Sequence, residues 1–311
     1  MTKQLEARIR SGEARAGVVG LGYVGLPLAV EFAASGLRVT GIDVSAPKVE
    51  AINAGRSYIL DVPTERVAGL VGKGLLSATS DFAAVKELDT INICVPTPLR
   101  KTREPDLSYV VGAIDGLLPY MRPGQLLILE STTYPGTTDE VVLPKLRAVG
   151  LEPGRDVEVA FSPERTDPGN KNFDTRTIPK VVGGCTPVAN AAARALYGRC
   201  IDQVVMVSSP RVAEMVKLLE NTFRSVNIAL ANEMAMMCDH LASTSGRSSR
   251  RRRRSPSASC RSIPGPASVG TASRSTRCTL RGRPRPRASS PASSSLRGRS
   301  TPPSPSSWPP R

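Results

Sequence analysis

The chain of 311 residues contains one histidine, one tryptophan and no pair of cysteines spaced as Cys-x-x-Cys. A single histidine, His240, argues against catalysis by histidine and against a metal held by histidine ligands. The scattered cysteines predict neither a zinc site nor a disulfide framework, so we expect no metal. The six cysteines are Cys94, Cys185, Cys200, Cys238, Cys260 and Cys278.

The sequence also lacks a signal peptide and an apolar run long enough to span a bilayer, which predicts a cytoplasmic protein without a membrane partner. Acidic residues are missing from one end only. Residues 242–311 hold 16 arginines and no lysine, aspartate or glutamate, whereas the first 241 residues hold 26 basic and 27 acidic side chains. The net charge of +15 therefore describes a basic tail on a nearly neutral body, and not a nucleic-acid-binding domain.

A glycine pattern near the start of the chain carries the first functional signal. A predicted buried strand ends at Val19, Gly20, Gly22 and Gly25 follow with the spacing G-x-G-x-x-G, and residues 26–34 predict an apolar helix. The first glycine permits a tight turn, the second lets the backbone approach a pyrophosphate, and the third lets helix and strand pack closely. The helix N-terminus favours the anion. The pattern predicts a dinucleotide site.

The choice of dinucleotide is predicted from the next strand. Residues 37–43 read as a second apolar strand that ends in Asp43, 18 residues past Gly25. A carboxylate at this place accepts hydrogen bonds from the ribose 2′-hydroxyl and repels the 2′-phosphate of NADP. We therefore predict NAD as the cofactor.

Apolar strands and amphipathic helices alternate as far as residue 207, and repeated βα units predict an α/β fold with a doubly wound, Rossmann-like parallel sheet. Ligands bind beyond the carboxyl ends of such strands. Further strands are predicted at 89–95, 125–131, 157–161, 180–184 and 204–207, and helices at 48–54, 64–73, 107–118 and 139–149. The predicted organisation is a lead-in (1–15), a dinucleotide-binding domain (16–207), a long central helix (208–241) and a disordered basic tail (242–311).

The long helix is predicted from apolar residues that recur at helical spacing over residues 210–241, which is typical of a core or dimer face. Lys217 and Asn221 are four residues apart and share one side of this helix. Glu214 and Arg224 are interleaved with the apolar residues around them. The combination favours a polar site beside the sheet.

Five motifs in this order resemble the nucleotide-sugar 6-dehydrogenases, the family of the UDP-glucose and GDP-mannose dehydrogenases. The motifs are Gly-Leu-Gly-Tyr-Val-Gly-Leu-Pro (20–27), Val-Pro-Thr-Pro (95–98), Glu-Ser-Thr-Thr-Tyr-Pro-Gly (130–136), Phe-Ser-Pro-Glu-Arg (161–165) and Glu-Met-Val-Lys-Leu-Leu-Glu-Asn (214–221). Residues 162–170 are more similar to the branch that oxidises UDP-N-acetylglucosamine or UDP-N-acetylmannosamine than to the UDP-glucose branch.

The resemblance implies that NAD oxidises the C6 alcohol of a UDP-sugar to the acid, in two steps, for surface polysaccharide precursors. A cysteine of the family holds the intermediate aldehyde as a thiohemiacetal. Glu164 is implied to act near thioester hydrolysis, Lys217 to stabilise an oxyanion and Asn221 to orient it; the 210–241 helix is implied to form a homodimer. The residues implied to contact the cofactor are Gly20, Gly22, Tyr23, Val24, Gly25, Asp43, Lys48, Thr97 and Thr132, the two threonines contacting the cofactor or an active-site water.

The family's cysteine belongs to a segment Gly-Gly-His-Cys-Ile-Pro-x-Asp that this chain lacks after its long helix. DNA that encodes residues 267–280 can also be read, from its third base, as Leu-Gly-Gly-His-Cys-Ile-Pro-Val-Asp-Pro-Leu-Tyr-Leu. Read in the same frame, the DNA can encode a continuous segment back to the Leu241 codon. The protein sequence fixes the last two bases of most codons in this frame, so the match does not come from a free choice of bases. We infer a one-base deletion after Leu241, so that Cys260 and Cys278 are by-products of a shifted frame.

Two other functions stay open. The missing cysteine favours an NAD-binding protein without turnover, and the charge alone favours a basic-tailed nucleic-acid binder. A continuous frame in the coding DNA would favour the enzyme, and a confirmed deletion would favour the non-catalytic protein. Saturable DNA binding by the chain without residues 242–311 would favour the third function, although we expect no specific nucleic-acid partner.

Overall fold

The computed structural model describes residues 2–98, 105–164 and 176–240 of the chain. The strands span Arg15–Val19 (β1), Arg38–Ile42 (β2), Leu76–Thr79 (β3), Thr90–Ile93 (β4), Leu126–Leu129 (β5), Glu158–Phe161 (β6), Lys180–Gly184 (β7) and Val204–Val207 (β8). The α-helices span Thr2–Ser11 (α1), Gly25–Ala34 (α2), Ala46–Asn53 (α3), Thr64–Gly72 (α4), Ser108–Leu117 (α5), Leu143–Ala148 (α6), Pro187–Tyr197 (α7) and Pro210–His240 (α8). Shorter helical turns cover Phe82–Glu87 (η1), Leu118–Tyr120 (η2) and Thr138–Val142 (η3, a π-helix).

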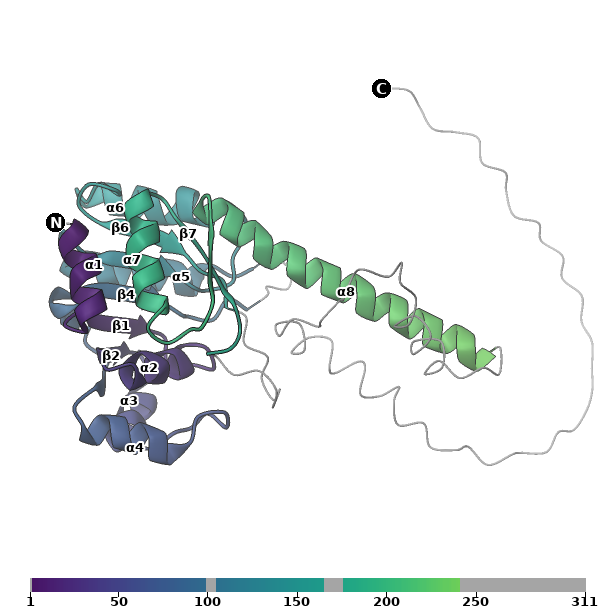
Figure 1. Cartoon of the computed structure of the whole chain (residues 1–311), viewed down its shortest axis with the longest axis horizontal. Coiled ribbons are helices and arrows are strands. Elements are labelled where there is room, and N and C mark those ends of the chain that lie inside the picture. Colours follow the sequence, from purple (N-terminus) through teal and green to yellow (C-terminus); the bar gives the residue numbers. More distant parts are fainter. Residues whose placement is uncertain (1, 99–104, 165–175, 241–311) are drawn as a thin grey trace, which may run out of the picture. The chain divides into compact units, whose positions relative to one another are not determined.

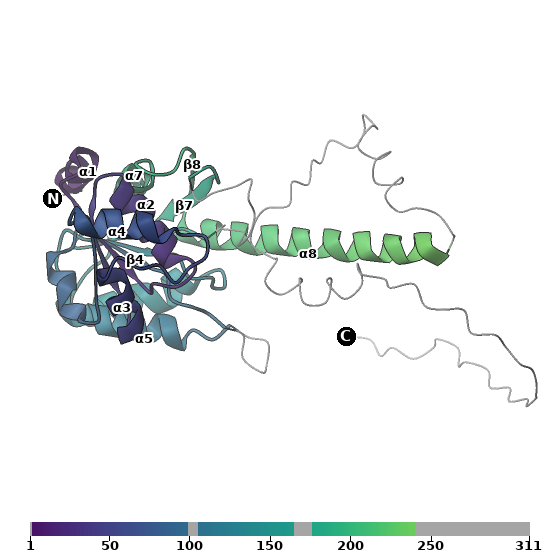
Figure 2. The same cartoon turned by 90° about the horizontal axis from the view of Figure 1, so that it is seen from below.

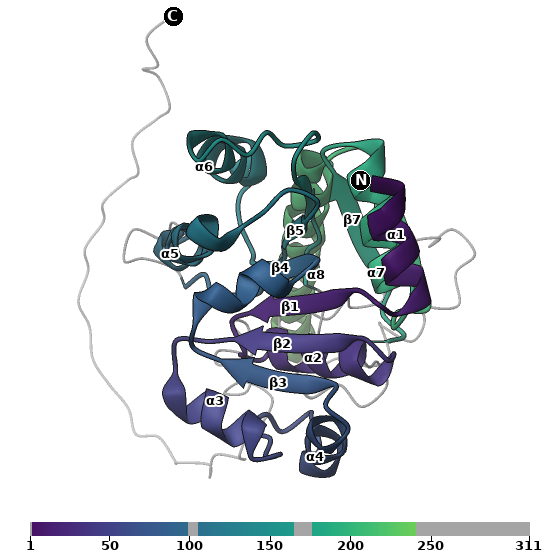
Figure 3. The same cartoon turned by 90° about the vertical axis from the view of Figure 1, so that its left-hand side faces the viewer.

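The eight strands form one sheet in the order β3-β2-β1-β4-β5-β6-β7-β8 (Figures 1 and 3). The chain adds β2 and β3 on one side of β1 and then returns to its other side with β4, so the order reverses between β1 and β4. Such a switch point opens a crevice at the carboxyl ends of the two strands. The predicted doubly wound α/β fold is confirmed, and the G-x-G-x-x-G turn stands at this crevice.

The prediction of a parallel sheet holds for six strands but not at β7, which runs antiparallel to β6 and carries β8 parallel to itself. Parallel strands need a crossover connection, usually a helix. An antiparallel pair needs no such crossover, and the register of β6 and β7 pairs Ala160 with Gly184 and Phe161 with Gly183. The start of β7 therefore lies beyond the carboxyl end of β6, on the side of the crevice.

Helices cover both faces of the sheet, and two hydrophobic cores result. One core joins the sheet to α1, α2, α3, α4 and α7, and the other joins it to η1, α5 and α6. Figure 3 shows α5 and α6 on one side of the strands and α1 and α7 on the other. Strands β4, β5, β6 and β7 are buried throughout, which fits their mainly apolar sequence.

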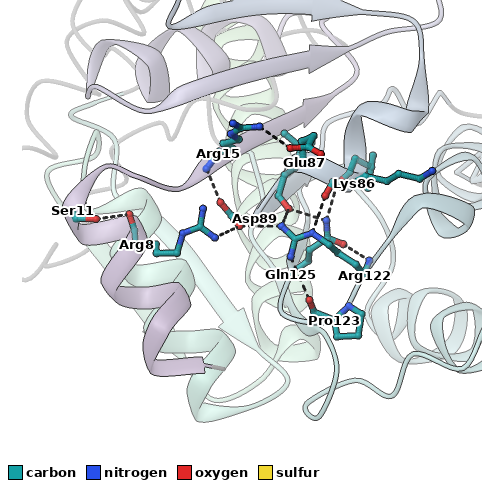
Figure 4. A network of polar contacts seen from close by, with 11 residues as sticks. Arg8, Ser11, Arg15, Lys86, Glu87, Asp89, Arg122, Pro123 and Gln125 are labelled. Carbon is teal, nitrogen blue, oxygen red and sulfur yellow. Dashed lines mark hydrogen bonds and ion pairs between the residues drawn. The ribbon is translucent and has the colours of Figure 1, made fainter.

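The N-terminal helix α1 belongs to the first core through Leu5 and Ile9, whereas only a lead-in was predicted for residues 1–15. A buried carboxylate fixes it to the sheet: Asp89 accepts from the Arg8 Nη1 at 2.6 Å and from the Arg15 backbone N–H at 2.9 Å (Figure 4). The Arg122 guanidinium donates to the same carboxylate at 3.2 Å. This network lies at the amino ends of β1 and β4, away from the crevice.

Helix α8 is the predicted long helix, and it is continuous from Pro210 to His240 (Figures 1 and 2). Its first turn packs on the sheet through Ala213 and Glu214, which are both buried. None of the described helices is long and apolar enough to cross a bilayer. The predicted disordered tail, and with it Cys260, Cys278 and the shifted segment, lies outside the described residues.

Candidate functional site

The fingerprint turn is built on two glycines at which any side chain would be strained. Gly20 has a φ of +88°, and its N–H donates to the Ile42 carbonyl at 2.8 Å, which ties the turn to the end of β2. A Cβ on Gly25 would lie 1.8 Å from the Gly20 carbonyl oxygen. A Cβ on Gly22 would meet no atom within 4 Å, so the space on this side of Gly22 is open. The turn therefore fits the approach of a pyrophosphate to Gly22.

The Asp43 carboxylate follows β2 and is buried beside this turn. It accepts from the Leu21 N–H at 2.8 Å, the Ser45 N–H at 2.9 Å and the Lys48 Nζ at 2.9 Å. The carboxylate is thereby fixed between the fingerprint turn and the start of α3, where the adenosine ribose of a dinucleotide lies in this fold. The structure thus brings together three of the residues that the sequence predicts to bind the cofactor, namely Gly20, Asp43 and Lys48.

Tyr23 and Val24 lie at the entrance to α2, directly before Gly25. The Tyr23 side chain is exposed, and Val24 packs against the first core. Leu26 donates its N–H to the Gly22 carbonyl, so the first turn of the helix begins within the fingerprint.

Asp43 should set the preference for NAD over NADP, and Asp43→Asn tests this by removing the negative charge while keeping one of the two acceptor oxygens. A carboxylate facing a 2′-phosphate costs several kcal/mol. We expect the variant to reduce the ratio of NAD to NADP affinity at least about tenfold, whereas Asp61→Asn, which changes an exposed loop carboxylate, leaves the ratio unchanged. Titration calorimetry measures the ratio; equal affinity of the unmodified chain for both cofactors would remove the role of Asp43. Asp43→Ala should relax the preference too, but it also deprives Leu21, Ser45 and Lys48 of their acceptor.

Two loops at the carboxyl ends of β4 and β5 carry the predicted threonines. Ser131 joins these loops, because its N–H donates to the Ile93 carbonyl and its hydroxyl donates to the Val95 carbonyl at 2.7 Å. Thr97 is partly exposed and Thr132 is exposed, each one or two residues beyond these bonds. The structure therefore places both threonines at the mouth of the crevice.

A buried cluster of charges lies below this mouth. The Glu130 carboxylate accepts from Asn92 Nδ2 and from the Tyr197 hydroxyl, each at 2.6 Å, and from Lys180 Nζ at 2.6 Å. Burial alone would lower the pKa of Lys180, but the attraction of Glu130 and Glu164 outweighs it and raises the pKa above its ordinary value. Lys180 is therefore a fixed cation held between Glu130 and Glu164.

The predicted catalytic residues adjoin this cluster. Lys180 Nζ also lies 3.2 Å from a carboxylate oxygen of Glu164, and Lys217 on α8 donates from its Nζ to the Glu164 carbonyl. Lys217 is buried, so its charge is held against the β6 end of the sheet. Asn221 lies one turn further along α8, and its Oδ1 is buried without a hydrogen-bond partner among the described residues. An orphaned amide oxygen at this place fits a polar ligand.

Glu214 fixes the register of α8 against the loop that carries Thr132. Its buried carboxylate accepts from the N–H of Gly136 and, at 2.9 Å, from the N–H of Thr138. The Thr138 hydroxyl donates to it as well, at 2.7 Å. Lys217 follows Glu214 by one helical turn, so the same contact that anchors the helix directs Lys217 toward Glu164.

Cys94, Cys185 and Cys200 are poor nucleophiles. Burial raises the pKa of Cys94 well above its ordinary value, with a further contribution from Glu130. Burial likewise raises the pKa of Cys185 and of Cys200 to about 12. A nucleophilic cysteine reacts as its thiolate, so none of these three thiols is suited to replace a missing catalytic cysteine.

Sequence reasoning missed Glu130 and Lys180 as members of the site, although both interrupt apolar strand sequence with a charge. Glu130 is the first residue of the motif at 130–136, but no role was predicted for it. Lys180 is the first residue of a predicted strand. A charge that ends up fully buried signals a partner across the sheet. The partner itself, on another strand, is visible only in the fold.

The family model described as the NAD binding domain of the UDP-glucose/GDP-mannose dehydrogenase family matches residues 14–201, and the central-domain model of that family matches residues 211–245. The chain is 38% identical over 231 residues to a UDP-N-acetyl-D-mannosamine dehydrogenase of Yersinia pestis, and this match covers 71% of the chain and 54% of that protein. It is also 38% identical to an NDP-N-acetyl-D-galactosaminuronic acid dehydrogenase of Ralstonia nicotianae, with 72% and 54% covered.

Among solved structures, the UDP-D-ManNAc dehydrogenase of Pyrococcus horikoshii superimposes with a TM-score of 0.73 at 36% identity, and the match covers 78% of this chain and 58% of that chain. The GDP-mannose dehydrogenase of Pseudomonas aeruginosa superimposes with the same TM-score of 0.73 at 28% identity. The chain spans about half the length of the curated relatives it matches.

Proposed function

The chain belongs to the UDP-glucose/GDP-mannose dehydrogenase family, and from this premise we propose that it carries the NAD-binding and central-helix part of a UDP-N-acetylhexosamine 6-dehydrogenase, with UDP-N-acetylmannosamine as the preferred substrate. The observation that supports this proposal most directly is the contact between Lys217 and Glu164 at the end of β6. It brings two residues, 53 apart in sequence, to one place beside the fingerprint crevice.

The proposed roles follow from the positions of these side chains. The fingerprint turn and Asp43 would hold NAD, which would supply the acceptor for a hydride from the sugar C6. Lys217 is a buried cation at a fixed place, so it stabilises the negative charge that develops on the C6 oxygen. Asn221 places its side-chain amide beside the same oxygen or beside a water molecule that contacts this oxygen. Glu164 positions water for hydrolysis of the acyl intermediate.

The chain as written should bind NAD without completing this reaction, and we propose that a shifted reading frame is the reason. The family's cysteine would have to hold the aldehyde, and the described thiols Cys94, Cys185 and Cys200 are buried with raised pKa values. The missing Gly-Gly-His-Cys-Ile-Pro-Val-Asp segment can be read from the DNA of residues 267–280 in the next frame. The second candidate function of this chain is therefore NAD binding without catalysis.

We also propose a homodimer through α8, because apolar side chains remain exposed along most of its length. A contiguous exposed apolar surface marks an interaction site or promotes aggregation. The exposed apolar residues of the helix are Val212, Met215, Leu218, Leu219, Phe223, Val226, Leu230, Met234, Met236 and Met237.

The proposed substrate is tested with the chain after its frame is restored by one base inserted behind the Leu241 codon. NADH formation is followed with UDP-N-acetylmannosamine, UDP-N-acetylglucosamine, UDP-glucose and GDP-mannose. The proposal expects the highest kcat/KM with UDP-N-acetylmannosamine. Equal or higher kcat/KM with UDP-glucose would overturn the substrate assignment, and no turnover of any UDP-sugar by the folded restored chain would overturn the enzymatic function.

A further inference from the structure

Tyr58 lies beside the fingerprint turn, although it comes from the segment between α3 and α4. Its hydroxyl donates to the Leu21 carbonyl oxygen at 2.6 Å. The ring is partly buried and packs against the first hydrophobic core. Burial, and then the nearby Asp43 carboxylate, raise the pKa of Tyr58 above its ordinary value. The phenol therefore stays protonated and is a permanent donor to this carbonyl.

The segment that presents Tyr58 is braced on both sides of the residue. Ile59 and Val62 are buried, and the Val62 N–H donates to the Ile59 carbonyl at 3.1 Å. The Ser57 hydroxyl bonds to both backbone groups of Ile59, and the Ser57 N–H donates to the Thr64 hydroxyl at the start of α4. A turn held in this way fixes the direction of the Tyr58 side chain.

Leu21 is consequently held at both of its backbone groups, by Asp43 at its N–H and by Tyr58 at its carbonyl. The Leu21 carbonyl and the Gly22 N–H belong to one planar trans peptide and point in opposite directions. Gly22 has no side chain to anchor this peptide, and the space at its Cβ position is open. Without Tyr58, rotation of the peptide would present a carbonyl, in place of an N–H, to an approaching anion.

We propose that Tyr58 is a positioning residue for the dinucleotide, which acts by holding the Leu21–Gly22 peptide so that the Gly22 N–H faces the pyrophosphate. The proposal rests on the NAD site described above and does not depend on turnover. The proposal predicts that Tyr58 affects the binding of the diphosphate part of the dinucleotide and not the binding of the adenosine part. Asp43, in contrast, acts on the adenosine ribose.

The difference in ligand chemistry gives a test with the chain as it exists. Tyr58→Phe should weaken NAD and ADP about fivefold, the effect of one hydrogen bond, and should leave adenosine affinity unchanged, whereas Asp43→Asn should weaken all three. Tyr120→Phe is the matched control, because this tyrosine lies in the second core on the opposite face of the sheet, and it should change none of the affinities. Unchanged NAD affinity in Tyr58→Phe, or an equal loss for adenosine, would overturn the proposal.

Amide hydrogen exchange of the unmodified chain provides a second test that needs no variant. NAD and ADP should slow the exchange of the Gly22 N–H, and adenosine should not. Bound NAD that leaves this amide as fast as before would overturn the role of Tyr58 while the NAD site itself stands. If NAD does not bind the folded chain at all, both the site and the proposal on Tyr58 are overturned.

Discussion

One base inserted after the Leu241 codon is expected to turn a chain without measurable turnover into an enzyme that reduces NAD with a UDP-N-acetylhexosamine. The insertion restores the cysteine, the aspartate of the same segment and the residues that follow them. Loss of the nucleophile in an enzyme with a covalent intermediate lowers kcat by roughly 10³-fold or more. We therefore expect at least this difference between the restored and the original chain, measured as NADH absorbance at equal concentration of folded protein.

The matched control is the restored chain with an alanine codon at the new cysteine. It keeps every other restored residue, so its rate separates the cysteine from the rest of the segment. If it retained full acid formation, the account of the nucleophile would be wrong. Turnover by the original chain would contradict the frame shift as the cause of inactivity. Independent sequencing of the gene decides whether the deletion is present in the DNA.

The second large effect is expected at the fingerprint. Gly25→Ala places a methyl group 1.8 Å from the Gly20 carbonyl oxygen, a distance that no real contact reaches, so the first turn of α2 must move away from β1. We expect NAD affinity to fall roughly 100-fold and the free energy of unfolding to fall by about 1–3 kcal/mol. Titration calorimetry and urea denaturation measure the two effects.

Gly69→Ala in α4 is the control for this substitution, because a Cβ there meets no atom within 4 Å. Replacing glycine by alanine inside a helix stabilises it by about 0.5–1 kcal/mol when space is available. Gly69→Ala should therefore raise the unfolding midpoint slightly and leave NAD affinity unchanged. A Gly25→Ala chain that binds NAD and unfolds like the unmodified chain would show that the close packing of α2 on β1 does not form the site.

Sequence rules were sufficient to predict the parts of the site whose residues are close together in the sequence. The turn at Gly20, the helix that follows Gly25 and the carboxylate of Asp43 all lie within one βαβ unit, whose geometry is repeated wherever this pattern occurs. The helix from Pro210 was predictable for a similar reason. Its apolar residues recur at helical spacing along 31 residues that contain no glycine and no internal proline.

The missed features depend on contacts between distant segments. Helix α1 is polar along most of its length, and only its docking through Leu5, Ile9 and the Arg8–Asp89 ion pair makes it part of the domain. The antiparallel direction of β7 is seen only in its pairing with β6. The Glu130–Lys180 pair joins residues 50 apart in sequence, each of which alone reads as an interruption of a strand.

Tyr58 shows the same limit within the cofactor site. Its partner Leu21 is 37 residues earlier, and the intervening chain includes β2 and α3. No spacing rule links a tyrosine at this place to a phosphate-binding turn. The sequence therefore reveals which glycines allow the pyrophosphate to approach, and the fold reveals which side chains hold the turn in the conformation that binds it.

We propose that the described part of this chain binds NAD at the fingerprint turn, although the chain spans only about half the length of its relatives. Titration calorimetry of the unmodified, folded chain with NAD measures this binding. We predict saturable binding of one NAD per chain, with NADP much weaker and ADP competing for the same site. A folded chain that shows no saturable NAD binding, or that binds NADP as tightly as NAD, would contradict the account.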